Sequence, residues 1–90
     1  MTEDAGAASP NPVRTAILEL IAARGAGKTI CPTEAAKAVS EAKWRALLPH
    51  VRAEAVRLAQ AGALAIYRKG KPVDPERFKG VYRLGLPPEA

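Results

Sequence analysis

Covalent or metal chemistry in this chain would depend on Cys31 and His50, because the sequence contains one cysteine and one histidine. A cysteine nucleophile needs a base and a third group that orients the base, and no such third group accompanies this pair. Cys31 directly precedes a predicted helix, where reactive thiols occur, but a buried small hydrophobe or a helix N-cap is the commoner role. His, Cys, Asp and Glu do not recur at the spacing of metal ligands. The sequence therefore predicts that the protein is not an enzyme and uses no metal or cofactor.

One segment, Gly25-Ala26-Gly27-Lys28-Thr29, shares residues with phosphate-binding loops. That pattern needs another glycine where the sequence has Ala22, a strand before the loop and a helix after it. Here a predicted helix precedes the segment and an extended segment follows it. We therefore interpret these residues as a glycine-rich connection.

Basic side chains offer a different chemistry, the binding of anions, and they are concentrated in the second half of the chain. Residues 1–42 carry four basic and five acidic side chains, whereas residues 43–83 carry ten basic and three acidic ones. Lysine and arginine neutralise phosphates without strict geometry, so this half would attract a nucleic-acid backbone or an acidic protein. The predicted nucleic-acid contacts are Arg45, His50, Arg52, Arg57, Arg68, Lys69, Lys71, Arg77 and Lys79.

Helices are expected to position several of these side chains. Asn11 is a typical N-cap for a helix that begins at Pro12 and ends at Gly25. Residues 29–31 form a short extended segment, and a second helix follows over residues 32–39.

A third helix is expected to begin at Pro49, because proline is better placed at the first position of a helix than in its interior. This helix would run to Ala61, with Val51 and Leu58 in the core and Arg57 outside. Just before it, Trp44 is predicted to anchor the core where the second and third helices meet, rather than to stack on a nucleobase.

The pattern changes to strands after the third helix. Residues 63–68 alternate, and residues 81–84 form a second β-branched and aromatic segment. Between them lies a loop too long for a tight turn, in which Asp74 before Pro75 indicates a single capped helical turn. The predicted fold class is α+β and mainly helical: a winged helix, with a three-helix core and a two- or three-stranded β-wing.

Length and composition limit the chain to one domain. It has 90 residues, 48% of them hydrophobic, and four aromatic side chains, which suits one thin core of small and aliphatic groups. We expect a disordered tail over residues 1–11, a domain over 12–84 and a C-terminal tail over 85–90. No secretory or membrane-spanning segment is expected, and a cytoplasmic monomer is predicted.

Several short motifs, taken together, are typical of one family. They are Ile30-Cys31-Pro32-Thr33-Glu34-Ala35-Ala36, Trp44-Arg45, Pro49 with Val51-Arg52, Leu58-Ala59, Gly62, Lys69-Gly70, Val73-Asp74-Pro75, and Gly80 with Arg83-Leu84. Over residues 13–84 the chain resembles a bacterial family of small proteins catalogued as a domain of unknown function (number 3253). It departs from that family at Val81-Tyr82, where the family has Pro-Ile. The resemblance implies a winged-helix fold and brings no known activity, cofactor or catalytic residue.

Two functions from different classes follow from this fold and charge distribution. The first is a small DNA-binding protein that contacts double-stranded DNA through its basic wing and third helix, with modest sequence specificity. The alternative is a protein–protein interaction module whose basic wing docks an acidic partner. A continuous positive stripe would favour the first function, and an apolar patch on the third helix would favour the second.

Overall fold

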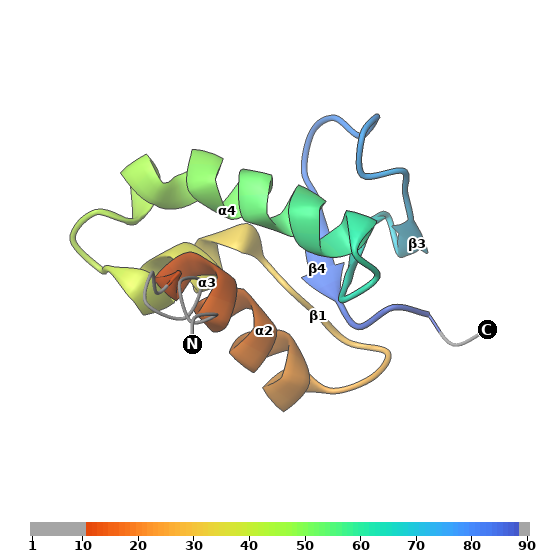
Figure 1. The fold of residues 1–90 in the computed structure, drawn as a ribbon, viewed down its shortest axis with the longest axis horizontal. Helices are drawn as coiled ribbons and strands as arrows, with labels where there is room; N and C mark the ends of the chain where they lie inside the picture. The colour runs from red at the N-terminus through yellow and green to blue at the C-terminus, as the bar shows by residue number, and fades with distance from the viewer. Residues whose placement is uncertain (1–10, 89–90) are drawn as a thin grey trace, which may run out of the picture.

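The computed structural model describes residues 11–88, so the tail expected over residues 1–11 lies, apart from Asn11, outside the described residues. The described chain is an α+β domain with three helices and one four-stranded antiparallel sheet (Figure 1). Labelled as in Figure 1, the elements are α2 (Pro12–Arg24), β1 (Thr29–Ile30), α3 (Pro32–Val39), α4 (Trp44–Gln60), β2 (Ala65–Arg68), β3 (Lys71–Pro72) and β4 (Arg83–Gly85).

The first two helices begin and end where their local sequence predicts. The Asn11 side chain accepts a hydrogen bond of 3.0 Å from the Arg14 N–H, and Gly25 ends α2 with a φ of 93°. At the start of α3, the Cys31 N–H donates to the Glu34 carboxylate at 3.1 Å. These contacts satisfy backbone groups that have no partner within the helix, so both helix boundaries are confirmed.

The predicted helix start at Pro49 is wrong. Pro49 lies inside α4, which begins at Trp44 and continues unbroken to Gln60. Proline cannot donate the usual hydrogen bond to the carbonyl four residues earlier. Its ring is exposed, however, and the apolar face of the helix continues past it from Leu48 to Val51. Burial of that face stabilises one long helix despite the lost hydrogen bond.

The sheet has the order β1-β4-β2-β3, with every neighbouring pair antiparallel. Leu84 of β4 lies opposite both Ile30 of β1 and Ile66 of β2, and all three are almost fully buried. β4 extends to Gly85, which the sequence assigned to the C-terminal tail. The sheet is thus larger than the predicted wing and includes the short strand that precedes α3.

β3 was not expected, because the sequence indicated one long loop between two strands. A two-residue turn at Lys69 and Gly70 joins β2 to β3, with φ values of 54° and 82°. Positive φ at both positions is typical of tight hairpin turns. The remaining loop does contain the single turn predicted at Asp74, whose carboxylate accepts from the Glu76 N–H at 2.9 Å.

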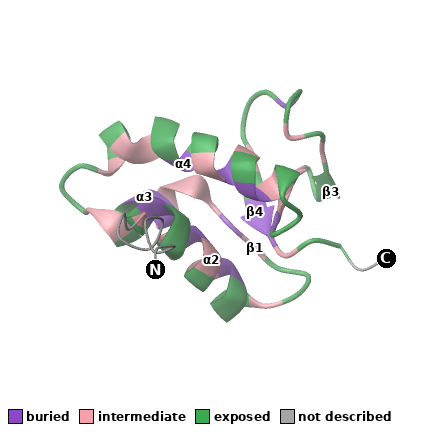
Figure 2. Cartoon of the chain, in the orientation of Figure 1, coloured by how far each residue is buried: buried purple, intermediate pink, exposed green. Residues whose placement is uncertain are grey.

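The core lies between the three helices and the sheet (Figure 2). Val51 and Leu58 face it from α4, as predicted, and Ile17 and Ile21 face it from α2. Phe78 also reaches the core from the long loop and is 6% exposed. Trp44 packs against the core but is only partly buried, so the prediction of a core anchor overstated its burial. Among the described helices, none is long and apolar enough to cross a membrane.

Candidate nucleic-acid interface

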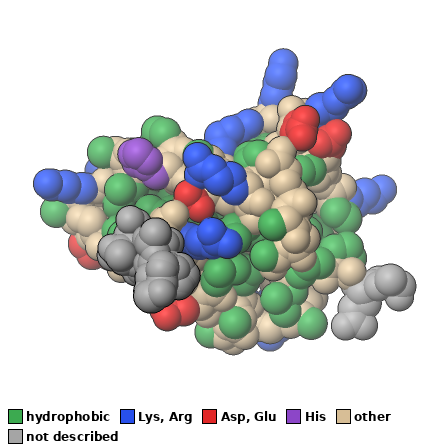
Figure 3. All heavy atoms as spheres, in the orientation of Figure 1, with side chains coloured by type: hydrophobic (Ala, Val, Ile, Leu, Met, Phe, Trp, Pro, Cys, Tyr) green, Lys and Arg blue, Asp and Glu red, His purple; other side chains and the backbone are tan. Residues whose placement is uncertain are grey.

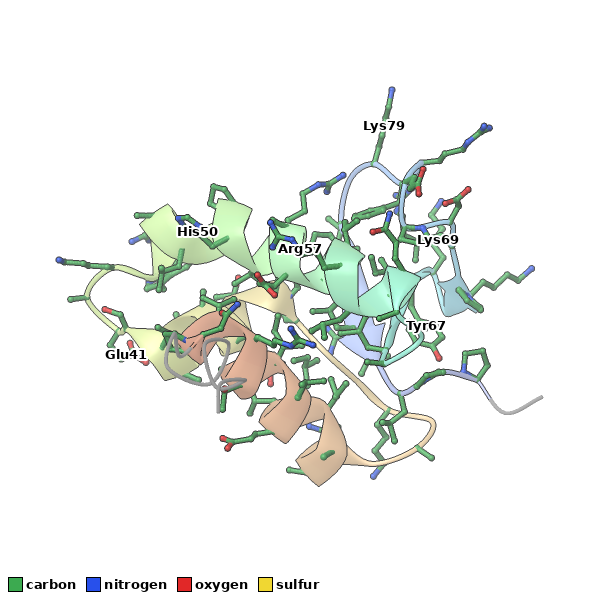
Figure 4. All side chains as sticks on the ribbon, in the orientation of Figure 1. Glu41, His50, Arg57, Tyr67, Lys69 and Lys79 are labelled. Atoms are coloured by element: carbon green, nitrogen blue, oxygen red, sulfur yellow. The ribbon has the colours of Figure 1, made fainter. Side chains whose placement is uncertain are left out.

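The long loop, residues 73–82, connects β3 to β4 beside the second half of α4 (Figure 1). We call its residues 78 and 80–82 the loop base; Lys79 between them projects outward and is described separately (Figure 4). One guanidinium nitrogen of Arg52 donates to the Phe78 carbonyl oxygen at 3.1 Å. The guanidinium carbon also lies 4.0 Å from the centre of the Phe78 ring and 5.7 Å from that of Tyr82. Arg52, a predicted nucleic-acid contact, therefore attaches the loop base to α4.

Two further arginines bind backbone carbonyls of the sheet and loop. Arg68 Nε donates to the Val81 carbonyl oxygen at 2.9 Å. Arg83 donates to the Thr29 hydroxyl at 2.6 Å and to the Thr29 carbonyl oxygen at 3.1 Å, which links β4 to β1. Arg68 was predicted to contact nucleic acid, and the structure shows that part of its guanidinium already has an internal partner.

The outer face of α4 has less free positive charge than its sequence suggests. Arg57 forms a 2.6 Å ion pair with Glu54 one turn earlier. His50 and Arg57 (Figure 4) border a hollow beside Asn11, whereas Arg52 lines a different groove, and Arg45 lies seven residues, or about two helical turns, before Arg52 on the same flank. The predicted contacts on α4 are therefore divided between two flanks and do not form one row.

The long loop also carries acidic side chains among its basic ones. Arg77 lies 3.8 Å from the Asp74 carboxylate. Glu76 accepts a hydrogen bond of 2.9 Å from Gln60 at the end of α4. In the space-filling view, acidic side chains lie beside basic ones on this protruding part of the molecule (Figure 3). The continuous positive stripe that would favour DNA binding is therefore interrupted by carboxylates between the long loop and Arg57.

Lys69, Lys71 and Lys79 differ from the arginines, and we call them the lysine set. All three are exposed, and none forms an ion pair or a side-chain hydrogen bond with another residue in the range 11–88. Lys69 and Lys71 lie at the β2–β3 turn, and Lys79 projects away from the long loop (Figure 4). No side chain of the described residues therefore competes with an outside anion for these three positive charges.

Two basic side chains lie over the indole ring of Trp44 at the start of α4. The Arg45 guanidinium carbon lies 4.3 Å from the indole ring, and Lys37 Nζ of α3 lies 5.0 Å from it. Arg45 is exposed and remains accessible to a phosphate while it stacks on the ring. This arrangement occupies the face of the indole, so the ring does not present a free surface for a nucleobase.

A groove of about 700 Å³ opens between the start of α3, the middle of α4 and residues 80–83. Its walls are mainly apolar, with Pro32, Leu48, Pro49 and Val81 among them. The sequence did not predict this groove, because its walls come from three segments far apart along the chain. The one sequence feature that could have indicated the groove is Val81, an apolar residue at which the chain departs from the family it resembles.

Two ionisable groups near these elements have shifted pKa values. The hydrogen bond from the Cys31 N–H lowers the pKa of Glu34 below its ordinary value of 4.5, and Arg24 lowers it further. Burial raises the pKa of Tyr82 above its ordinary value of 10.0, although the positive charge of Arg52 opposes the shift. Glu34 is therefore ionised and Tyr82 keeps its proton at neutral pH. In residues 11–88, no group of three or more His, Cys, Asp or Glu side chains is arranged to hold a metal ion.

A comparison of the chain with known protein families tests the resemblance that the motifs indicate. Residues 10–87 match the family described as Protein of unknown function (DUF3253). The chain belongs to this family. The match spans all seven elements of the described chain. A search of curated proteins finds no match to the chain.

Proposed function

We propose that this protein is a winged-helix protein of the cytoplasm that binds double-stranded DNA as a monomer, with modest sequence specificity. In this proposal, α4 is the third helix of the winged helix, and residues 69–82 form the wing. The proposed activity is binding and not catalysis.

The order and pairing of the elements support a winged helix. Along the chain, β1 lies between α2 and α3, and the other three strands follow α4. Within the sheet, β4 lies between β1 and β2. The segment 69–82 therefore projects from the sheet beside α4, as a wing does beside a recognition helix (Figure 1).

The observation that carries the proposal is the lysine set. Three ammonium groups on the proposed wing are exposed and unpaired within residues 11–88, and Arg45 adds an exposed guanidinium at the other end of α4. Exposed cations without internal partners can each neutralise a phosphate and release a counterion. Internal ion pairs and hydrogen bonds would compete with such contacts, and within residues 11–88 the lysine set makes none.

Modest specificity follows from the outer face of α4. Arg57 is paired with Glu54, and the exposed residues on the same side of α4 include Ala46 and Ala53, whose side chains offer no hydrogen bonds to base edges. Arginine, lysine, asparagine and glutamine are the usual side chains for such contacts. Phosphate contacts therefore dominate the proposed interface.

Salt-dependent binding to a random DNA duplex tests this proposal. With four to five phosphate contacts, the logarithm of the association constant should fall against the logarithm of salt concentration with a slope of about −4. Fluorescence anisotropy with a labelled random duplex at low and moderate salt gives this slope. Absence of binding at low salt, where attraction to phosphates is strongest, would exclude the proposal.

A further inference from the structure

The groove between α3, α4 and the loop base has the size and lining of a small-molecule site. Its volume of about 700 Å³ lies within the usual range for ligand sites in proteins. Val81 at its rim is 83% exposed and is the only large hydrophobic side chain in residues 11–88 that is exposed to this degree. Burial of such a side chain under a ligand would be favourable.

The charge of the lining is entirely positive. Arg52 and Arg83 both contribute to it, and no acidic residue of the described chain does. Arg52 uses one nitrogen for the Phe78 carbonyl, and Arg83 uses two for Thr29. Because a guanidinium has five N–H groups, Arg52 retains donors for an anion in the groove. Arg83 adds positive charge to the lining, although it also lies close enough to Glu34 to lower the pKa of that carboxyl group.

Tyr82 adds a neutral donor to the same site. Its ring packs edge-to-face on Phe78, with 5.1 Å between centroids, and it lines the groove. Its hydroxyl makes no hydrogen bond to another residue in the range 11–88 and is not fully buried. The hydroxyl is thus free to donate to a carboxylate oxygen.

We infer that this groove binds a small amphipathic carboxylate, with an apolar chain or ring lying against Leu48, Pro49 and Val81. Its carboxylate accepts hydrogen bonds from Arg52 and the Tyr82 hydroxyl, and the positive charge of Arg83 adds to the attraction. The apolar walls select against a bare anion such as inorganic phosphate, and the guanidinium groups select against neutral or cationic amphiphiles. This site is separate from the lysine set, so the inference does not depend on DNA binding.

The single cysteine provides a built-in reporter. Cys31 lines the groove and is partly exposed, so a ligand in the groove should slow its alkylation by iodoacetamide. We expect octanoate to slow alkylation of the full chain and to shift the amide signals of residues 80–83 in a heteronuclear NMR spectrum. Octan-1-ol should bind about tenfold more weakly, because it lacks the charged acceptor. Octylammonium should give no protection.

Substitutions of Val81 give a matched pair of variants. Because its side chain is exposed, neither Val81→Glu nor Val81→Lys should disturb the fold, which circular dichroism and thermal melting would verify. Both remove the same apolar contact, but the glutamate also repels a carboxylate. Octanoate should bind Val81→Glu at least about tenfold more weakly than Val81→Lys.

Three results would overturn the inference. Equal affinities for octanoate and octan-1-ol would show that the guanidinium groups do not contribute to binding. Shifts that map to the α2–α3 surface instead of residues 80–83 would place the ligand elsewhere. Unchanged octanoate binding in Val81→Glu would exclude the groove. Since no DNA is present in these measurements, their failure is distinguishable from a failure of the DNA proposal.

Discussion

The arginines around the loop base and the lysine set at the proposed wing carry the same charge but differ in what they contact. Arg52, Arg68 and Arg83 each donate to a backbone carbonyl within the molecule. The lysine set makes no ion pair or side-chain hydrogen bond within residues 11–88. The planar guanidinium binds and stacks in a fixed geometry, whereas the ammonium is a strongly hydrated point charge on a flexible stem. In this region, arginine holds the loop in place and lysine remains available to a partner.

The difference matters because charge counts treat both regions alike. The sequence assigns ten basic side chains to residues 43–83, yet several of their donors are already used inside the molecule. Available charge, and not formal charge, determines how many phosphates a surface can neutralise. The comparison therefore makes two separable predictions: changes to the residues that attach the loop base, Phe78 and Arg52, alter stability, and changes in the lysine set alter binding.

The largest expected effect on stability is at Phe78, the aromatic residue that attaches the loop base to the core. Phe78→Ala should lower the free energy of unfolding by about 3 kcal/mol, because a 6% exposed ring leaves a cavity and Arg52 loses its stacking surface. Urea denaturation measures the loss. Val81→Ala, at an exposed position of the same loop base, is the matched control and should change stability by less than about 0.5 kcal/mol. Similar losses in the two variants would mean that the loop base is not attached as described.

Arg52 should have an intermediate effect. Arg52→Ala removes one charged hydrogen bond and its stacking on Phe78, for a loss of about 1–2 kcal/mol in unfolding free energy. Arg52→Lys keeps the charge but not the planar geometry, so it should recover less than half of this loss. Full recovery of stability in Arg52→Lys, measured by the same denaturation, would show that only the positive charge is needed here. The proposed difference between arginines and lysines in this region would then be wrong.

The sequence predicted those parts of the fold that depend on neighbouring residues. Asn11 with Pro12, Gly25 and Pro32 marked helix ends correctly, because capping is a local interaction. The interior position of Pro49 was missed, because burial of the continuous apolar face of α4 outweighs one lost hydrogen bond. The turn at Lys69 and Gly70 was missed because lysine is an unusual residue at positive φ.

The site was less predictable, because its contacts join residues far apart in the chain. Exposure of the basic residues followed from their sequence pattern, but their partners did not. Arg52 binds Phe78, 26 residues later, and Arg83 binds Thr29, 54 residues earlier. The groove has the same origin, since α3, α4 and the loop base form its walls together. Only the packed fold reveals which cations are already engaged.

The smallest expected effect on stability, and the largest on DNA binding, belongs to the lysine set. Replacing Lys69, Lys71 and Lys79 together with alanine should change the free energy of unfolding by less than about 0.5 kcal/mol, because no side-chain contact within residues 11–88 is lost. The same variant should reduce the magnitude of the salt slope for a random duplex by about 3, one unit for each lost phosphate contact. All duplex sequences should be weakened alike, since phosphates carry no sequence information.

A matched variant separates the position of these charges from their number. Replacing Arg14, Lys28 and Lys37 with alanine lowers the net charge by the same amount. These residues lie on α2, on the connection from α2 to β1 and on α3, respectively. If residues 69–82 lie along the DNA, this control should retain most of the slope, because distant exposed charges are screened beyond about 10 Å at moderate salt. Equal losses in the two triple variants would show that binding follows net charge alone. A stable lysine-set variant with an unchanged slope would place the DNA elsewhere, and the distinction between arginines that hold the loop and lysines that bind a partner would then describe stability only.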